Sequence, residues 1–571
     1  MKNKFLFLFS AVACTVVAGY SQTTDKNRIP SEVISVEKGY DPQVKAGSKT
    51  PFSPDESPES STKLPVSYRT DAEAAQFDFT ASSVAALVMD GQVPAALYPN
   101  YLKGGIGYNL STLLEGYYSH SWGKNTFGAA LNHDRAERKL DFLTDNSVFN
   151  HSDASLSFKH TAGRYDLGVY ANYAYNAFTN NGSRLAEEYS STLPLILRHN
   201  EITGGVFIRS HSGYRAFDHL NLEASYLNGP NKTGDSYVKA SAGFYFPVKK
   251  LMFSLDVAGA YYHNKWVSEP YDIFLSGGPS AQPATQTQDF EHLMATPALS
   301  YKSDRLDLYV GARMEVMAGS RIDTKFHIMP EVKASYSIVE GLLSVYGRLE
   351  SGYQVQNTAS LLHENPFVGP LTSAFYSREK FKAQIGLSGV FSSSFRYEIS
   401  AAYGQTDNTP AWINYRQIAG NGYLSYYVPG WDNIQVFDLK VSGDYTINPS
   451  HRISAFAQYL HGSSDTFSSA LYTPDFRIGA SYRGQVLRDR IGLSGRIVYN
   501  GASKGFEMIG ISGQEVDVDG YVEFQAEASY RFADHWSLFV QANNTIDGRA
   551  VRFYGYDWCG TRALIGVRFN F

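Results

Sequence analysis

The chain has 571 residues, of which 18% are charged, and its formal net charge is −5. A charge this small, with no basic stripe, argues against nucleic acid as a partner. Aromatic residues make up 14% of the chain, with 41 Tyr and 35 Phe. This enrichment is typical of proteins at membrane–water interfaces, where one edge of an aromatic ring stays wet.

The N-terminus has the parts of a secretory signal peptide. Lys2 and Lys4 precede an apolar stretch over residues 5–18, and Gly19-Tyr20-Ser21 follows with small residues three positions and one position before the expected cut. We therefore predict a signal peptide over residues 1–21, cleaved after Ser21. A lipidation site at Cys14 is disfavoured because the apolar stretch continues beyond it.

The cysteine count limits the chemistry of the mature chain. The sequence contains only Cys14 and Cys559. Because Cys14 lies inside the predicted signal, the mature chain would hold a single thiol. Neither an intramolecular disulfide nor a cysteine metal site is then possible.

Residues 22–95 have the composition of a linker. Pro, Ser, Lys and Glu are frequent, as in residues 49–58. Such a segment buries too little apolar surface to offset the entropy lost on ordering. We expect a largely unstructured periplasmic extension over residues 22–95.

From about Tyr101 to Phe571 apolar and polar residues alternate with a period of two, which predicts strands. Residues 306–316, 437–447 and 522–532 each place apolar side chains on one face and most of their charges on the other. No apolar run in the mature chain approaches the ~20 residues that a spanning helix requires. In lipid, backbone polar groups can be satisfied only by helices or closed sheets.

The connections between these strands distinguish a barrel from a soluble sandwich. About 22 strands are counted, each near the ~9–11 residues of a tilted spanning strand. Short and long connections alternate along the chain, as short periplasmic turns and long extracellular loops do in outer-membrane barrels. The short set includes 123–125, 162–163, 249–250, 303–304, 340–341, 448–450 and 533–534, and the long set includes 176–199, 263–290, 353–377, 405–434, 462–474, 501–519 and 544–561.

We therefore predict an all-β fold: a transmembrane antiparallel β-barrel of about 22 strands over residues 96–571, in the outer membrane of a Gram-negative bacterium. One connection, near residues 109–112, is short where a long one is expected. The final alternating strand ends on Phe571. A terminal aromatic residue of this kind is typical of the signal read by the barrel-insertion machinery, which is an expected partner together with outer-membrane lipid.

The closing stretch resembles that of TonB-dependent receptors. It runs from Asn543-Asn544 through Gly560-Thr561-Arg562 to Phe571, and residues 329–336 are similar to strands of that family. The resemblance implies a 22-strand barrel and solute uptake. The family fills its barrel with a globular plug, for which residues 22–95 are unsuited. A segment similar to the energy-coupling box offered to TonB consists of Glu32, Val33, Ile34, Ser35 and Val36.

No catalytic motif occurs in usable context, so we predict no enzyme, no cofactor and no metal. The charged residues of the alternating strands are expected to face the lumen and to pair across strands. They would form either a selective constriction or ordinary solvated lining. They are Arg313, Glu315, Glu331, Lys333, Arg348, Glu350, Arg396, Glu398, Asp438, Lys440, Arg496, Glu523, Glu527, Arg531 and Arg568.

One long predicted loop is rich in aromatic residues, which suit sugar rings or apolar ligands. Packing of the loop on itself would explain the same composition. The residues are Trp412, Tyr415, Tyr423, Tyr426, Tyr427 and Trp431.

The favoured function is uptake or passage of a solute across the outer membrane by a receptor-like barrel. TonB or another periplasmic protein is an expected partner of the N-terminal tail. A first alternative function is a non-transport structural or assembly role, in which this tail binds a periplasmic or plug-supplying protein. A second alternative is a secreted soluble β-protein or adhesin.

Overall fold

A computed structural model describes most of the C-terminal five-sixths of the chain: residues 100–108, 110–138, 147–180, 196–211, 216–230, 233–268, 284–369, 375–419, 422–543, 552–556 and 562–571. The predicted signal peptide, the predicted extension at 22–95 and the TonB-box-like segment lie outside the described residues. No described helix is long and apolar enough to cross a membrane.

The described residues form strands and one short helix. In chain order these are β1 (Tyr101–Gly107), β2 (Ser111–Trp122), β3 (Asn125–Arg138), β4 (Ser147–Ala162), β5 (Tyr165–Thr179), β6 (Ile196–Ser210), β7 (His219–Asn228), β8 (Gly234–Val248), β9 (Leu251–Ser268), β10 (Ala284–Lys302), β11 (Leu306–Gly319), β12 (Ile322–Val339), β13 (Leu343–Gln356), α3 (Thr358–Glu364), β14 (Phe375–Ser392), β15 (Phe395–Ala419), β16 (Gly422–Asn448), β17 (His451–Ser464), β18 (Phe476–Val486), β19 (Ile491–Asn500), β20 (Ser503–Ile509), β21 (Ser512–Val518), β22 (Tyr521–Arg531), β23 (Trp536–Asn543) and β24 (Arg562–Asn570).

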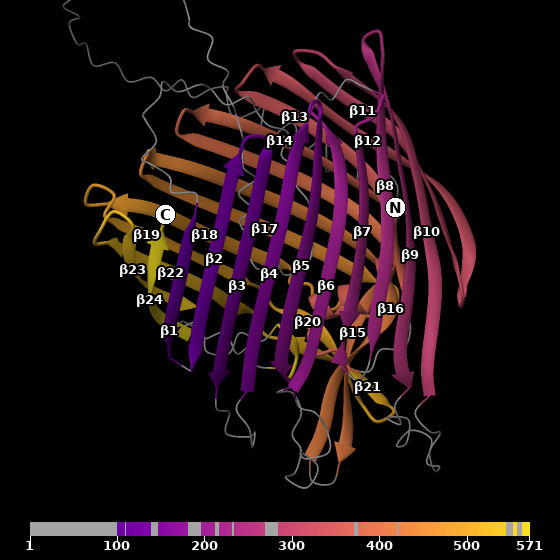
Figure 1. Cartoon of the computed structure of the whole chain (residues 1–571). Coiled ribbons are helices and arrows are strands. Elements are labelled where there is room, and N and C mark those ends of the chain that lie inside the picture. The colour runs from indigo at the N-terminus through magenta and orange to yellow at the C-terminus, as the bar shows by residue number, and fades with distance from the viewer. Residues whose placement is uncertain are drawn as a thin grey trace, which may run out of the picture. The chain divides into compact units, whose positions relative to one another are not determined.

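The wall is a closed antiparallel barrel (Figure 1). Each strand pairs with the next, β19 pairs directly with β22, and β1 closes the ring on β24, from Tyr101 opposite Asn570 to Gly107 opposite Leu564. Of the 24 strands in the sheet, all but β20 and β21 belong to this wall, which gives 22. The predicted fold class and strand number are confirmed.

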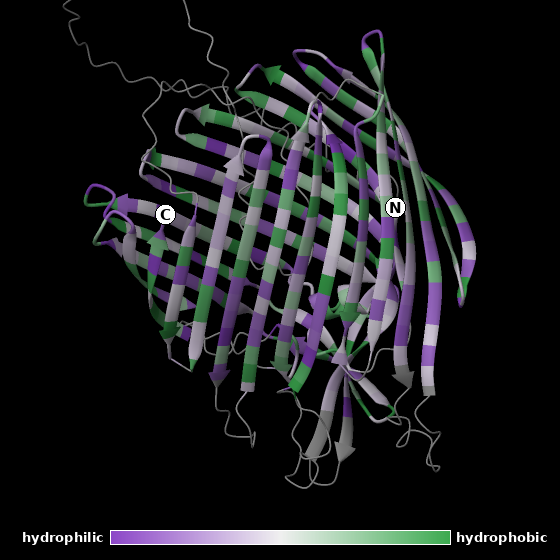
Figure 2. Cartoon of the chain, viewed as in Figure 1, coloured by the Kyte–Doolittle hydropathy of each residue, from purple (hydrophilic) through white to green (hydrophobic). Residues whose placement is uncertain are grey.

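The apolar face of the wall points outward. On β16, Phe437, Leu439 and Val441 are 38–45% exposed. Asp438 and Lys440 stand between them on the opposite face. Figure 2 shows the same mixture of apolar and polar bands along the strands. Since a large exposed apolar surface is stable only in hydrocarbon, this face is the lipid-facing one and the charged face lines the lumen.

Tight turns close one end of the barrel. Gly123 has φ +57° and Gly163 has φ +62°, a region that favours glycine, and each begins a two-residue connection. The chain end at Phe571 lies at the same end, where its backbone N–H donates to Asn100. Short turns mark the periplasmic end of such barrels, so the opposite end is extracellular.

The alternation of connection lengths holds for most of the wall, with exceptions besides the one near 109–112. The periplasmic connection between β6 and β7 spans residues 211–218, and the extracellular connection between β11 and β12 is only residues 320–321.

The prediction of a loop at 405–434 is wrong. β15 and β16 have 25 and 27 residues and pair as a continuous hairpin to Ala419 and Gly422. In Figure 1 this hairpin extends past the ends of its neighbours. Beyond the membrane, both faces of a strand pack on protein or meet water, so the apolar-out alternation that marks the spanning part is lost.

The predicted loop at 501–519 contains a second extracellular hairpin, β20–β21. β20 pairs in parallel with the extension of β15, from Ile413 opposite Phe506 to Arg416 opposite Ile509. The two hairpins therefore form one small sheet outside the barrel wall.

Candidate functional site

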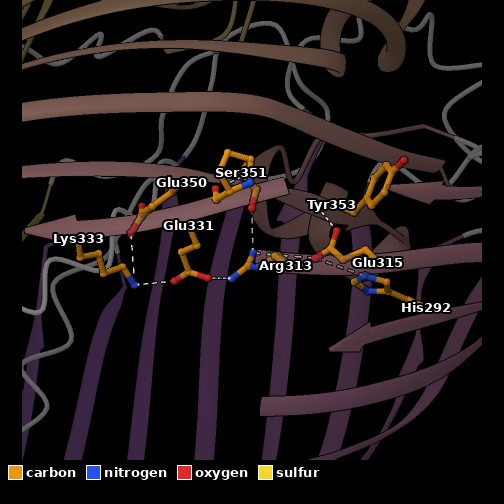
Figure 3. Close-up of polar contacts among 9 residues, drawn as sticks. His292, Arg313, Glu315, Glu331, Lys333, Glu350, Ser351 and Tyr353 are labelled. Carbon is orange, nitrogen blue, oxygen red and sulfur yellow. Dashed lines mark hydrogen bonds and ion pairs between the residues drawn. The ribbon is translucent and has the colours of Figure 1, made fainter. Parts of the chain in front are cut away.

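A cluster of charged side chains on the lumen face lies on strands β10 to β13 (Figure 3). Arg313 and Glu315 occupy alternate positions of β11, and Glu331 and Lys333 do so on β12. The register sets Glu331 opposite Gly311 and Lys333 opposite Tyr309. Strand pairing thus brings four predicted lumen residues side by side.

Arg313 lies at the centre of the cluster. Its guanidinium Nη2 is 3.5 Å from Glu331 Oε2, and Nη1 is 3.9 Å from Glu315 Oε1. Nη1 also donates to the Ser351 carbonyl at 3.2 Å. One cation therefore bridges two carboxylates on neighbouring strands.

An irregularity in β13 supplies further partners. The pairing of β13 with β14 shifts register between Glu350 and Gly352, as at a β-bulge. A bulge redirects the residues that follow it. Here it directs the Tyr353 backbone N–H to Glu315 Oε2 at 2.8 Å, beside the Ser351 carbonyl that contacts Arg313.

The outer part of the cluster is a second cation between two carboxylates. Lys333 Nζ lies 2.8 Å from Glu331 Oε1 and 3.6 Å from Glu350 Oε1. The side chains of Lys333 and Glu350 are 45% and 42% exposed, whereas Glu315 is 1% exposed. The cluster therefore runs from a buried carboxylate to a hydrated edge.

The balance of charge in this cluster is uneven. Three carboxylates face two permanent cations, with His292 Nε2 3.8 Å from Glu315 as a further contact. His292 Nε2 and Arg313 Nε have no hydrogen-bond partner although both are buried. The arrangement can offer carboxylate oxygens and N–H donors to a polar solute in the lumen.

Most other predicted lumen residues make separate, local contacts. Glu398 accepts from the Tyr346 hydroxyl at 2.6 Å, and Asp438 accepts from Gln458 at 3.0 Å. Glu523 accepts from Asn500 at 3.0 Å. Cations lie over aromatic rings in three cases: Arg348 over Tyr346, Lys440 over Phe456 and Arg568 over Tyr101. Arg396, Arg496 and Arg531 lie opposite Asp444, Gln525 and Ser537.

A partly buried ion pair near the barrel closure joins Glu527, a predicted lumen residue, to Lys103, which sequence reasoning missed. Lys103 Nζ contacts Glu527 Oε2 at 2.8 Å and Glu115 Oε2 at 3.7 Å. Lys103 and Glu115 lie opposite each other on the paired strands β1 and β2, whereas Glu527 on β22 comes within reach of Lys103 only when the ring closes. No short-range pattern could have paired Lys103 with Glu527.

The extracellular end of the barrel holds a hydrophobic cluster that we call the mouth core. Its members come from β7, α3, the β15–β16 hairpin and the β23–β24 connection, which start at widely separated points around the wall. Their side chains can meet only over the lumen. The mouth core consists of Leu227, Ala359, Leu361, Leu362, Phe367, Val368, Trp412, Tyr427, Phe553 and Tyr556.

Several of the predicted loop aromatics are buried in or beside the mouth core. Trp412 is 3% exposed, Tyr427 0% and Tyr426 9%. Trp431 packs against the core, and Tyr415 lies beside Tyr426. The side chain of Tyr423 lies outside the described residues. In this state Trp412, Tyr426 and Tyr427 are packing residues rather than an open platform for a ligand.

Helix α3 is attached to the barrel wall on several sides. The Ala359 backbone N–H donates to Asp235 on β8 at 2.9 Å. His363 Nε2 lies 3.4 Å from Glu201 on β6. On β15, Trp412 Nε1 donates to Glu364 at 2.7 Å. Burial raises the pKa of the Glu364 carboxyl, and the Trp412 hydrogen bond and the charge of Arg552 offset part of this effect.

Hydrogen bonds join the remaining loops to the same centre. The Tyr427 hydroxyl donates to the Tyr554 carbonyl at 2.9 Å and lies 3.2 Å from the Tyr472 hydroxyl. Asn180, after β5, donates to the Ser425 carbonyl at 2.8 Å. Side chains from at least five extracellular connections are thus joined at this end of the barrel.

Within the described part of the chain, no three His, Cys, Asp or Glu side chains are placed to hold a metal ion. The alternate carboxylates of β21, Glu515 and Asp517, bind protein groups. Glu515 accepts a hydrogen bond from the Ser468 backbone N–H at 2.7 Å, and this hydrogen bonding lowers the pKa of Glu515. Asp517 pairs with Lys504 at 2.6 Å.

No family model matches the sequence, and no curated protein matches it. Among solved structures, the chain is similar to the ferric yersiniabactin uptake receptor FyuA from Yersinia pestis, with 12% identity and a TM-score of 0.61 over 84% of this chain and 81% of that one. It is also similar to the FrpB iron transporter (F5-1 variant) from Neisseria meningitidis, with 11% identity and a TM-score of 0.60 over 83% and 82%.

A further similar structure is the pyoverdine outer membrane receptor FpvA from Pseudomonas aeruginosa, with 12% identity and a TM-score of 0.58 over 84% of this chain and 79% of that one. At these identities the likeness concerns the fold. The chain has the barrel fold of outer-membrane receptors, as the resemblance of its closing strand implied.

Proposed function

We propose that this protein takes up a solute across the outer membrane through a barrel whose extracellular mouth is gated. The observation that carries the proposal is the mouth core, in which Leu227 on β7 and Phe553 from the β23–β24 connection, at separate sectors of the wall, are buried in one cluster with Tyr427. A steady pore would leave this opening free. A barrel that admits a chosen solute needs a closure that can be released.

The lumen cluster gives such a solute polar contacts inside. Lys333 and Glu350 form its hydrated edge, while Arg313 and Glu315 hold the buried end. Exposed ion pairs of this kind contribute only about 0–1 kcal/mol to stability, so their groups can exchange partners with a passing polar molecule at low cost. We expect no catalytic step.

The N-terminal segment is the proposed link to the periplasm. Residues 22–95 have linker composition, which supports a tail in place of a globular plug. The stretch Glu32–Val36 is the proposed contact for TonB or another periplasmic protein. Protease treatment of the inserted protein from the periplasmic side tests this: a tail is removed, whereas a plug is protected.

Planar-bilayer conductance of the purified full-length protein tests the gate. We expect the wild type to be nearly silent and Asp235→Ala, which removes the acceptor of the Ala359 N–H, to show frequent openings. The matched control is Asp307→Ala, an exposed carboxylate at the periplasmic end of β11. A large steady conductance of the wild type would contradict the gate.

Silence of both variants, together with copurification of another protein through residues 22–95, would favour the structural or assembly role instead. The same copurification should then be lost on deleting that segment. Loss of uptake on the same deletion, with no partner retained by the barrel, would point back to transport.

A further inference from the structure

A shallow groove lies on the lipid-facing side of the barrel where β24, β1 and β2 meet. It has a volume of about 430 Å³, and its lining includes Gly104, Ile106, Leu114, Ile565 and Val567. Ile106 is 69% exposed and Ile565 is 59% exposed. The groove is therefore apolar and opens toward the bilayer.

Glycine makes the floor of this groove. A Cβ placed on Gly104 would meet no atom within 4 Å, so the space above it is empty. The next pair along the strands is Gly105 opposite Gly566. The strands here are also short, with seven residues in β1 and nine in β24. Gly105 and Gly566 face the lumen and lie against the Phe539 ring, so the empty space is on the lipid-facing side, over Gly104.

A row of hydrogen-bonded polar side chains borders the groove on its extracellular side. Thr112 Oγ1 lies 3.2 Å from His133 Nε2, and His133 Nδ1 lies 2.8 Å from Ser152 Oγ. Ser152 in turn donates to Asn150 Oδ1 at 3.0 Å. His133 is two residues from the exposed Leu131 on β3, so the row shares the lipid-facing side.

Positions along β3 indicate the depth of this row in the membrane. Phe127 lies in an aromatic girdle at the periplasmic end, with Tyr118 at 6.2 Å, and Tyr118 reaches Phe571 at 6.3 Å. From Phe127 the strand needs ~9–11 residues to cross the hydrocarbon. Glu137, in contact with Arg135, lies at that distance along the strand. The polar row, level with His133 and Arg135, therefore lies two to four residues below Glu137, in the outer half of the span.

We propose that this surface is a binding site for one outer-leaflet glycolipid. An acyl chain fills the groove over Gly104, and headgroup sugar hydroxyls exchange hydrogen bonds with Thr112, His133 and Ser152. Two features favour a sugar over a simple phosphate: the row offers hydroxyl, imidazole and amide groups, and Arg135 is already neutralised by Glu137. The groups of the row already bond one another, as hydrocarbon requires, and a sugar hydroxyl at this place would exchange into the same network.

Native mass spectrometry of the full-length protein, released from nanodiscs containing lipid A or phosphatidylglycerol, tests the site. We expect one lipid A to stay bound to the wild type and its retained fraction to fall at least five-fold in Gly104→Leu, which fills the groove. Gly347→Leu is the matched control, because its added Cβ also meets only ordinary contact, the Gln384 carbonyl at 3.8 Å.

A second variant, His133→Leu, keeps the groove and removes the centre of the polar row. It should lower lipid A retention without changing that of phosphatidylglycerol. Equal retention by the wild type and Gly104→Leu would overturn the site and leave only unspecific boundary lipid. Equal retention of both lipids by the wild type would overturn the sugar preference. Heat-modifiable gel mobility verifies that each variant is a folded barrel.

Discussion

Trp412 on β15 donates its indole N–H to the Glu364 carboxylate at the end of α3, at 2.7 Å. Trp412 is 3% exposed, so this hydrogen bond lies inside the mouth core. It joins an extended wall strand to a helix that comes from the β13–β14 connection. Any opening of the mouth that withdraws α3 must break it.

The mouth should be held more firmly at low pH. Burial raises the pKa of Glu364 above its ordinary 4.5, so the docked state favours the protonated carboxyl. A raised pKa contributes stability that is fully present below pH 4.5 and is lost as pH rises through the raised value. Hydrogen exchange of residues 357–369, corrected for intrinsic rates, should therefore show more frequent opening at pH 7 than at pH 4.

Glu364→Gln is the control for this pH effect. The amide keeps an acceptor for Trp412 but does not titrate in this range. Its exchange protection should be the same at both pH values after correction. A pH dependence equal to that of the wild type would assign the effect to another group.

Leu361→Ala should loosen the mouth. Leu361 is 1% exposed, and truncating a buried Leu costs about 2–5 kcal/mol, through lost transfer free energy and a residual cavity. The change should appear as faster exchange of α3 and as openings in bilayer recordings. Leu342→Ala, at a periplasmic turn where the side chain is 49% exposed, should alter neither.

Arg313→Met should destabilise the barrel wall. It removes the cation shared by Glu315 and Glu331, and Glu315 is 1% exposed. Because Arg313 itself is 31% exposed, we expect a loss of about 1–3 kcal/mol, the cost of leaving a buried polar group poorly satisfied. The denaturant midpoint for loss of heat-modifiable mobility measures it. Adding Glu315→Gln should recover part of the loss, and no recovery would show that the two residues are not coupled.

Lys333→Gln tests whether the lumen cluster meets solute. Lys333 is 45% exposed, so stability should change by less than about 1 kcal/mol. In a background opened by Asp235→Ala, the loss of one cation should shift the reversal potential toward cation selectivity. Lys250→Gln, at a periplasmic turn, is the control. An unchanged reversal potential would mean that the cluster is only wall lining.

Much of the wall follows from the sequence because hydrocarbon imposes a strict rule on it. Each spanning strand must be apolar on its outer face, so segments such as 437–447 carry a period-two pattern that is visible without neighbours. This requirement for an apolar outer face applies only within the hydrocarbon. For that reason the extracellular halves of β15 and β16, and the hairpin β20–β21, were predicted as loops.

The lumen cluster was predicted as a set of residues but not as a site. Arg313, Glu315, Glu331, Lys333 and Glu350 were each expected on the inner face. Their convergence depends on the register of β11 with β12 and on the irregularity after Glu350. No sequence pattern indicates this register or this irregularity, so the contacts of the Ser351 carbonyl with Arg313 and of the Tyr353 N–H with Glu315 could not be predicted.

The sequence by itself determined which side chains of each strand face lipid and which face the lumen, because hydrocarbon and water select different residue types on the two faces of every strand. It also determined the number of wall strands, through the repeat of that selection. Only the tertiary structure decided which distant residues are in contact. Examples are the closure of β1 on β24, the pairing of Lys103 with Glu527, and the hydrogen bond from Trp412 to Glu364 of α3. These contacts join residues tens to hundreds of positions apart, and their energies depend on distance in space, which a linear pattern does not encode.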